Sequence, residues 1–238
     1  MQARMNRNTR SRATKRITLR CIRARRSPGS EGEKLMQKSC KVHEDTTKLR
    51  PPTADVIRAA AGCRIPDLIA PDLRVLFCGI NPGLYSAATK RHFARPGNRF
   101  WQALHLAGFT PRVLAPDEGH DLLELGYGIT SLVRRATATA REVAAEELVA
   151  GRRRLARTMR IHRPRWVAVF GVSAYRVAFG QPRAEVGQQQ DTLGGTGVWL
   201  LPSPSGANGS YPLVELVDKL REFYAAVGQA KLGLMTDL

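Results

Sequence analysis

Two loops rich in glycine, proline and serine carry the residues of this chain that could do chemistry. The first is Gly-Ile-Asn-Pro-Gly at residues 79–83, and the second spans residues 202–209; each follows an apolar run. Glycine-rich loops let the backbone come close to a ligand and offer it N–H donors. Asn81 brings a carboxamide to the first loop, and Phe93 adds an aromatic face twelve residues later. Together these two side chains could hold a planar heterocycle.

Both side chains also have an ordinary structural interpretation. Asn81 could simply serve a strand-to-helix turn, because asparagine often caps such turns. Phe93 could equally be a core residue. The position of Asn81 directly after an apolar run is nevertheless informative, because ligands of parallel α/β sheets bind just beyond the carboxyl ends of strands. Asn81 therefore lies where a catalytic group would be placed.

Other common chemistries lack their sequence signatures. Gly79 and Gly83 do not form the G-x-G-x-x-G fingerprint of a dinucleotide site. Residues 171–173, Gly-Val-Ser, begin like a nucleophile elbow but lack its closing glycine, so Ser173 is interpreted as a helix cap. The five histidines include no H-x-x-x-H pair and the four cysteines no C-x-x-C pair, so no metal site is predicted. His92 lies beyond Asn81 and could face either a ligand or the solvent.

Continuous apolar runs predict the strands that position these loops. Runs at residues 74–78, 166–170 and 198–201 predict strands buried on both faces, and residues 128–133 predict a further short strand. Residues 85–97 read as a loop. Helices are predicted around residues 53–63, 99–107, 119–125, 144–159, 174–179 and 212–227. This alternation predicts an α/β fold, a single domain with a central, mainly parallel sheet flanked by helices on both faces.

The net charge of +18 is concentrated toward the amino terminus. Residues 1–66 contain 17 Lys and Arg against 5 Asp and Glu, whereas residues 67–238 contain 21 against 15. Residues 1–52 are predicted to be a disordered basic tail and linker, and residues 53–230 the folded domain. The tail could be an arm that follows DNA, an organelle transit peptide, or the result of a start codon assigned upstream of Met36. A basic tail on a basic body favours a polyanionic partner, most simply nucleic acid.

Two stretches resemble the motifs of mismatch-specific uracil-DNA glycosylases, the bacterial relatives of thymine-DNA glycosylase. Gly-Ile-Asn-Pro-Gly-Leu at 79–84, followed by Phe-Ala-Arg-Pro-Gly-Asn-Arg-Phe-Trp at 93–101, is similar to the first motif. Leu-Pro-Ser-Pro-Ser-Gly at 201–206 is similar to the second, whose third residue is usually asparagine. The resemblance covers residues 67–227. It implies a single α/β domain that hydrolyses the N-glycosidic bond of uracil, or of thymine or etheno-cytosine, opposite guanine in DNA.

The resemblance implies roles for residues of the first motif. Asn81 matches the catalytic asparagine, which orients a water toward C1′, because an amide has no useful basicity at neutral pH. Backbone N–H groups of the turn formed by Gly79, Ile80 and Asn81 are the implied donors to the departing uracil anion. Phe93 matches the aromatic residue that stacks on the flipped base, and Ser86 is implied to contact the base edge. No lysine nucleophile is implied, so we expect a monofunctional enzyme, and without a catalytic aspartate we expect it to be slow. Whether an acid from residues 117–121 assists Asn81 stays open.

The second motif implies a loop that enters the gap left by the flipped nucleotide and contacts the orphaned guanine. Ala207 stands where relatives often carry a leucine or arginine wedge, and a methyl group cannot fill an emptied base site. We therefore expect weaker discrimination for guanine, with Asn208 or Tyr211 partly substituting. The matching loop residues are Ser203, Pro204, Ser205, Gly206, Ala207, Asn208 and Gly209, and the expected phosphate contacts are Lys90, Arg91 and Arg95.

The expected partner is double-stranded DNA with a G·U or related mismatch, bound by a monomer in the bacterial cytosol. No cofactor or metal is expected. No membrane is expected as a partner either, because no apolar run approaches the length of a membrane span. One alternative from another class stays open. A protein on the same scaffold could recognise mismatches or abasic sites without turnover, which Ala207 and the basic tail would suit.

Overall fold

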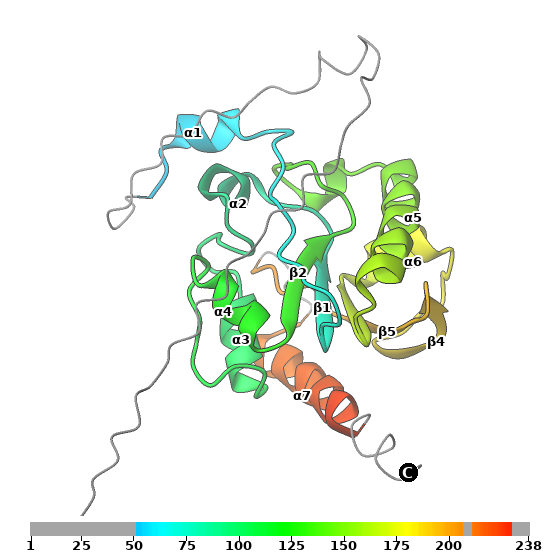
Figure 1. The fold of residues 1–238 in the computed structure, drawn as a ribbon. Helices are drawn as coiled ribbons and strands as arrows, with labels where there is room; N and C mark the ends of the chain where they lie inside the picture. Colours follow the sequence, from blue (N-terminus) through cyan, green and yellow to red (C-terminus); the bar gives the residue numbers. More distant parts are fainter. Residues whose placement is uncertain (1–50, 207–210, 230–238) are drawn as a thin grey trace, which may run out of the picture. The chain divides into compact units, whose positions relative to one another are not determined.

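A five-stranded sheet organises the part of the chain that the computed structural model describes, residues 51–206 and 211–229. The strand order is β2-β1-β3-β5-β4, and only the edge strand β4 runs antiparallel to its neighbour. Figure 1 shows β1 and β2 side by side. The strands are β1 (Val75–Gly79), β2 (Tyr127–Ser131), β3 (Trp166–Phe170), β4 (Gly187–Leu193) and β5 (Thr196–Leu201). Because the other four strands are parallel, their carboxyl ends meet at one edge of the sheet. The predicted, mainly parallel sheet is confirmed.

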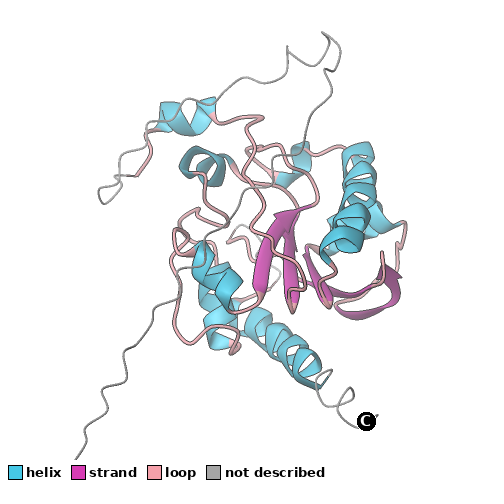
Figure 2. Cartoon of the chain, viewed as in Figure 1, coloured by secondary structure: helices cyan, strands magenta, loops and turns pink. Residues whose placement is uncertain are grey.

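Helices cover both faces of this sheet (Figure 2). Successive strand residues point to opposite faces. Val75 and Phe77 pack on one side against α3 (Phe100–Leu106), α4 (Gly119–Glu124) and α7 (Leu213–Gln229). Leu76 and Cys78 pack on the other side against α5 (Ala145–His162) and α6 (Val172–Phe179). Strands buried on both faces explain why three of them are visible in the sequence as continuous apolar runs.

One segment predicted to be a loop begins with a helix. Residues 85–97 read as a loop, but α2 (Leu84–Thr89) occupies the first part and ends at Lys90, which has a left-handed φ of 54°. The buried face of α2 is Ser86, Ala87 and Ala88, and it packs near α1 (Ala54–Ala59) in a small cluster of alanines. Such small residues give no strong apolar periodicity, so the pattern of large side chains misses this helix.

No apolar pattern in the sequence predicts β4. Its residues are mostly glutamine and other polar types, and all of them before the buried Leu193 are only partly buried or exposed. β4 is an edge strand whose side chains are mostly exposed, so it needs no continuous apolar run. β4 forms because it pairs with β5, and this pairing cannot be recognised from the local sequence.

Ser173 is not the helix cap that its sequence context predicts. It is the second residue of α6, and the N-cap position belongs to Gly171, whose φ is 103°. A side chain at residue 171 would be strained at this φ, and its Cβ would lie 2.7 Å from Ile80 Cδ1. The turn after β3 therefore needs glycine both for its backbone and for the contact with the loop after β1.

The predicted basic tail lies outside the described residues, apart from Pro51 and Pro52. The short helix predicted near residue 53 is present as α1, with the Thr53 hydroxyl accepting from the N–H of Val56 at 3.5 Å. Among the described residues, no helix is long and apolar enough to cross a membrane.

Candidate active site

The carboxyl ends of the parallel strands open into a cavity of about 670 Å³, a size suited to a small planar ligand. Gly79 ends β1, Ser131 ends β2 and Phe170 ends β3, and all three line this cavity. The loop after β5 adds Pro202 and its neighbours. The remaining lining comes mainly from the segments 80–83, 92–98 and 137–141, the start of α6, and Tyr211.

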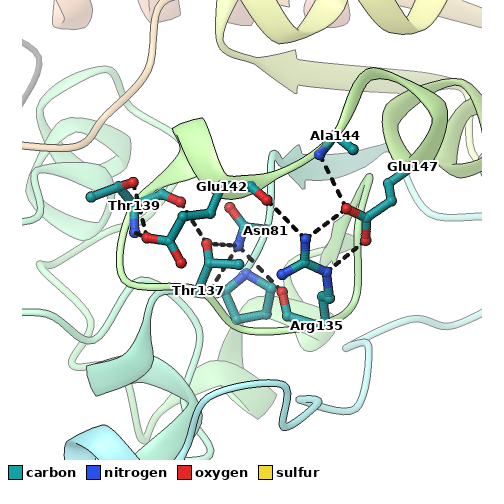
Figure 3. Close-up of polar contacts among 8 residues, drawn as sticks. Asn81, Arg135, Thr137, Thr139, Glu142, Ala144 and Glu147 are labelled. Atoms are coloured by element: carbon teal, nitrogen blue, oxygen red, sulfur yellow. Dashed lines mark hydrogen bonds and ion pairs between the residues drawn. The ribbon is translucent and has the colours of Figure 1, made fainter.

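Asn81 lines the cavity with its carboxamide held in one orientation (Figure 3). Its Nδ2 donates to the Thr137 hydroxyl at 2.7 Å, to the Pro82 carbonyl at 3.1 Å and to the Arg135 carbonyl at 3.2 Å. Backbone carbonyls can only accept, so the nitrogen and the oxygen of this amide cannot be exchanged. No described residue donates to Oδ1, which leaves this oxygen as the acceptor that a ligand or water can use.

The wall that holds Asn81 is itself fixed by an ion pair. Arg135 donates from its guanidinium to both carboxylate oxygens of Glu147 at 2.6 Å and to the Glu142 carbonyl at 2.9 Å (Figure 3). The Thr137 hydroxyl, which accepts from Asn81, donates to the Thr139 carbonyl at 2.6 Å. Each group in the chain from Asn81 to α5 therefore has a defined partner, which restricts rotation of the carboxamide.

The ion pair predicts a pH dependence of stability. Hydrogen bonds from Arg135, and then from the Ala144 N–H, lower the pKa of Glu147 from 4.5 to about 2. Since the folded-state pKa is depressed, this contribution is present above pH 4.5 and is lost as the pH falls from 4.5 toward 2. We expect Glu147→Gln to flatten the fall of the urea unfolding midpoint in this window. Glu146→Gln, a neighbouring exposed carboxyl, is the control; equal pH profiles for the wild type and Glu147→Gln would refute this role.

Phe93 is held at the cavity by a strained backbone. Its φ of 53° is rare for an aromatic residue, and such strain persists only when the surroundings enforce it. The Ser86 hydroxyl oxygen accepts from the N–H of Ala94 at 3.1 Å, and the Phe93 ring stacks on Phe100 with centroids 4.0 Å apart. A Cβ on Gly79 would lie 3.3 Å from Phe93 Cζ, so glycine lets the ring approach the end of β1. The sequence-predicted residues Gly79, Ile80, Asn81, Ser86 and Phe93 all line one cavity.

His92 is a neutral member of the cavity wall. It is buried, and burial lowers the pKa of its imidazole. Its Nε2 lies 2.8 Å from the Pro66 carbonyl; because a carbonyl only accepts, Nε2 carries the hydrogen and Nδ1 is the acceptor. The sequence left open whether His92 faces a ligand or the solvent. The side chain is buried, so it does not face the solvent.

No described residue that lines the cavity is an aspartate or glutamate. The acids of residues 117–121 bind arginines elsewhere: Glu118 and Asp121 pair with Arg112 at 2.7 and 3.0 Å, and Asp117 lies 3.7 Å from Arg91. The supplementary acid considered for this region is not present in the cavity. Within the described part of the chain, no group of three or more His, Cys, Asp or Glu side chains could hold a metal ion.

Arg99 fastens the second loop to the first motif. Its guanidinium donates to the carbonyls of Pro204 at 3.4 Å, Ser205 at 2.9 Å and Tyr211, and its N–H donates to Pro204 at 3.0 Å. Ser203, Pro204 and Ser205 line the main cavity, as predicted loop residues, and Gly206 lines an adjoining hollow. Ala207, Asn208 and Gly209 lie outside the described residues, so their predicted roles stay predictions.

Gly206 lies against the backbone of the first motif. A Cβ at residue 206 would come within 2.6 Å of the Gly97 carbonyl oxygen, which is backbone and cannot rotate away. We expect Gly206→Ala to displace the second loop and to destabilise the fold by about 1–3 kcal/mol. Thermal unfolding and duplex affinity are the measurements. Gly228→Ala, on an open surface of α7, is the matched control and should be neutral or slightly stabilising; equal behaviour of the two variants would contradict this contact.

The three predicted phosphate contacts occupy different positions. Arg95 is exposed and lines the cavity, whereas Lys90 and Arg91 do not line it. Arg91 is also engaged with Asp117. Arg141, which no sequence pattern distinguishes, also lines the cavity.

Comparison with known proteins shows the family of this chain. The family model described as the Uracil DNA glycosylase superfamily matches residues 66–226. The chain belongs to this superfamily, and it is a DNA glycosylase that acts on uracil. A solution NMR structure from Methanosarcina acetivorans, of a protein named as a candidate uracil DNA glycosylase, is a distant likeness. It has a TM-score of 0.45 and 18% identity, over 67% of this chain and 96% of that chain.

Proposed function

We propose that this glycosylase is monofunctional and hydrolyses the N-glycosidic bond of uracil mispaired with guanine in duplex DNA, thereby initiating base excision repair. The observation that carries the proposal is the fixed carboxamide of Asn81. Its nitrogen is bound to three acceptors, while Oδ1 receives no hydrogen bond from the described residues. We further propose that the protein acts as a monomer in the bacterial cytosol.

Asn81 Oδ1 orients the attacking water toward C1′ of the extruded nucleotide. An amide oxygen accepts a hydrogen bond from water but cannot take its proton at neutral pH. Orientation suffices if the glycosidic bond breaks before water attacks, which leaves an oxocarbenium-like sugar. The absence of carboxylates from the described lining of the cavity supports this order of events, because no stronger base is at hand. The reaction should accordingly be slow.

The base enters the cavity beside Phe93, which lines it. One face of the Phe93 ring already stacks on Phe100, so the flipped base stacks on the remaining face. The Ser86 hydroxyl accepts from Ala94 N–H and keeps its own hydrogen available for the base edge. Backbone N–H groups of the turn at residues 79–81 stabilise the uracil anion as it leaves. No lysine occurs among the described lining residues, which supports hydrolysis without a Schiff base.

Recognition of the opposite guanine is assigned to the second loop. Ser205, within this loop, lines the main cavity, Gly206 lines the adjoining hollow, and residues 207–209 follow in the sequence. Because Ala207 is too small to fill an emptied base site, we propose incomplete discrimination for guanine, with Asn208 or Tyr211 contributing. Ala207→Leu should then tighten binding to a mismatch or an abasic product, and unchanged affinity would remove this explanation.

A substrate panel tests the proposal. Single-turnover release of free base is measured for uracil opposite guanine, uracil opposite adenine, uracil in a single strand, thymine opposite guanine and etheno-cytosine opposite guanine. Uracil opposite guanine should be released fastest. Its advantage over uracil opposite adenine should be smaller than it would be with a leucine or arginine at position 207. Equal rates for all uracil contexts would contradict mismatch specificity, and binding to G·U without any release would favour a recognition protein.

A further inference from the structure

Arg154 of α5 places a positive charge beside the end of β2. Its Nη2 donates to the carbonyl of Ser131 and, at 3.0 Å, to that of Leu132. Gly151 allows this approach of α5, since a Cβ at residue 151 would lie only 2.2 Å from the Leu132 carbonyl oxygen. A guanidinium stays protonated in proteins, so a full charge lies against the two carbonyls.

Stability alone does not explain a charge at this position. Nη1 of Arg154 is buried without a hydrogen-bond partner among the described residues, which is unfavourable for a charged group. Its ion-pair partner Asp67 lies 4.0 Å away and already accepts from Arg134 at 2.8 Å and from the Thr130 hydroxyl at 2.9 Å. One carboxylate therefore faces two guanidiniums, and this cluster keeps an excess positive charge.

The two carbonyls that accept from Arg154 belong to peptide groups that also bind the first loop. On the first of these peptides, the N–H of Leu132 donates to the Gly79 carbonyl at 2.8 Å. On the second, the N–H of Val133 donates to the Ile80 carbonyl, also at 2.8 Å. Each peptide is thus held between the guanidinium on one side and the loop on the other.

The two loop carbonyls share their peptide groups with the N–H groups of Ile80 and Asn81. Both residues line the cavity, and neither N–H donates to a backbone carbonyl among the described residues. Two rows of hydrogen-bonded peptides therefore connect Arg154 to N–H groups at the cavity. Arg154 itself does not line the cavity.

We propose that Arg154 is a positioning residue that strengthens the hydrogen bonds from the N–H groups of Ile80 and Asn81 to the departing uracil anion. This inference rests on the proposed function, in which these N–H groups stabilise the leaving base. A carbonyl that accepts from a cation makes the N–H of its own peptide a stronger donor, and a chain of hydrogen bonds passes this polarisation on. The guanidinium also fixes both peptides, so the donors are aligned before the glycosidic bond breaks.

The strength of the leaving group separates this role from a merely structural one. Fluorine withdraws electrons, so the 5-fluorouracil anion is more stable than the uracil anion and needs less help from donors. Single-turnover release is measured from duplexes with one G·U or one G·5-fluorouracil pair, at a temperature where every variant is folded. Wild type is compared with Arg154→Met, which removes the charge, and with Arg154→Lys, which keeps it. Arg153→Met is the matched control, because Arg153 is exposed on α5 and does not line the cavity.

Arg154→Met should slow uracil release about tenfold, which is less than the loss of a whole donor because both N–H groups remain. The same variant should slow 5-fluorouracil release only about threefold or less, since less charge stabilisation is needed. Arg154→Lys should lie between Arg154→Met and the wild type, and Arg153→Met should match the wild type.

Amide proton chemical shifts test the peptide rows without turnover. In Arg154→Met the amide protons of Leu132 and Val133 should move upfield, because their hydrogen bonds to the first loop weaken, and in Arg153→Met they should not. The proposal is overturned if both shifts stay unchanged in Arg154→Met, or if this variant slows the two bases by the same factor or slows neither. A wild type that releases no uracil would instead contradict the proposed function.

Discussion

Asn81→Ala is expected to lower the single-turnover rate of uracil release by about 10³-fold, a typical loss for one positioned catalytic group. The substitution removes the oxygen that orients water and leaves the rest of the cavity in place. The rate is measured with enzyme in excess over a duplex with one G·U pair. Affinity for the same duplex should change little, because the amide nitrogen is bound within the protein. A wild-type rate would show that Asn81 is not the group that acts on water.

Asn81→Asp distinguishes orientation from basicity. A carboxylate could act as a base, yet one of its oxygens would face the carbonyls of Pro82 and Arg135, which lie 3.1 and 3.2 Å from the present nitrogen. Three oxygens in contact repel one another and lose two hydrogen bonds. We therefore expect Asn81→Asp to be slower than the wild type. A faster rate would indicate that the missing base, and not the fixed orientation, limits this enzyme.

Thr137→Val is expected to slow uracil release roughly 10- to 100-fold, because small displacements of a catalytic group are costly. Valine has nearly the same shape as threonine, but it neither accepts from Asn81 nor donates to the Thr139 carbonyl. The carboxamide then has only the two longer contacts to hold it. The measurement is again the single-turnover rate, together with the thermal unfolding midpoint.

Thr110→Val is the control for this variant. Thr110 is also buried and donates to the Arg112 carbonyl at 2.7 Å, but it does not line the cavity. Both variants should lose similar stability, whereas only Thr137→Val should lose rate at a temperature where both are folded. Equal losses of rate would mean that Thr137 acts only through general stability.

The parts of the fold that can be predicted from the sequence are those with a strong local signal. Strand β3 has the bounds that its apolar run predicts, since a strand buried on both faces is a continuous apolar run. Asn81 lies at the end of a parallel strand, as predicted, because that edge of such sheets is where ligands bind. Phe93 could be assigned equally to the core or to a ligand; its ring stacks on the core ring of Phe100, and it also lines the cavity.

The residues that the sequence does not reveal act over long distances in the chain. Asn81 is bound by Arg135 and Thr137, 54 and 56 positions away, and Arg99 holds carbonyls more than 100 positions away. Neither a motif nor a periodicity connects such residues, because they meet only when strands β1, β2 and β5 align. Arg141 carries a charge like many others in this basic chain, and only its place beside the cavity distinguishes it.

We propose above all that this chain hydrolyses the bond to uracil with a water positioned by Asn81. A single-turnover time course of the wild type on a duplex with one G·U pair tests it most directly, with free uracil and strand integrity followed together. We expect uracil to appear while the strand stays intact, and alkali then to cut the strand at the former deoxyuridine. Duplex binding without release of uracil, or strand cleavage before alkali is added, would contradict it.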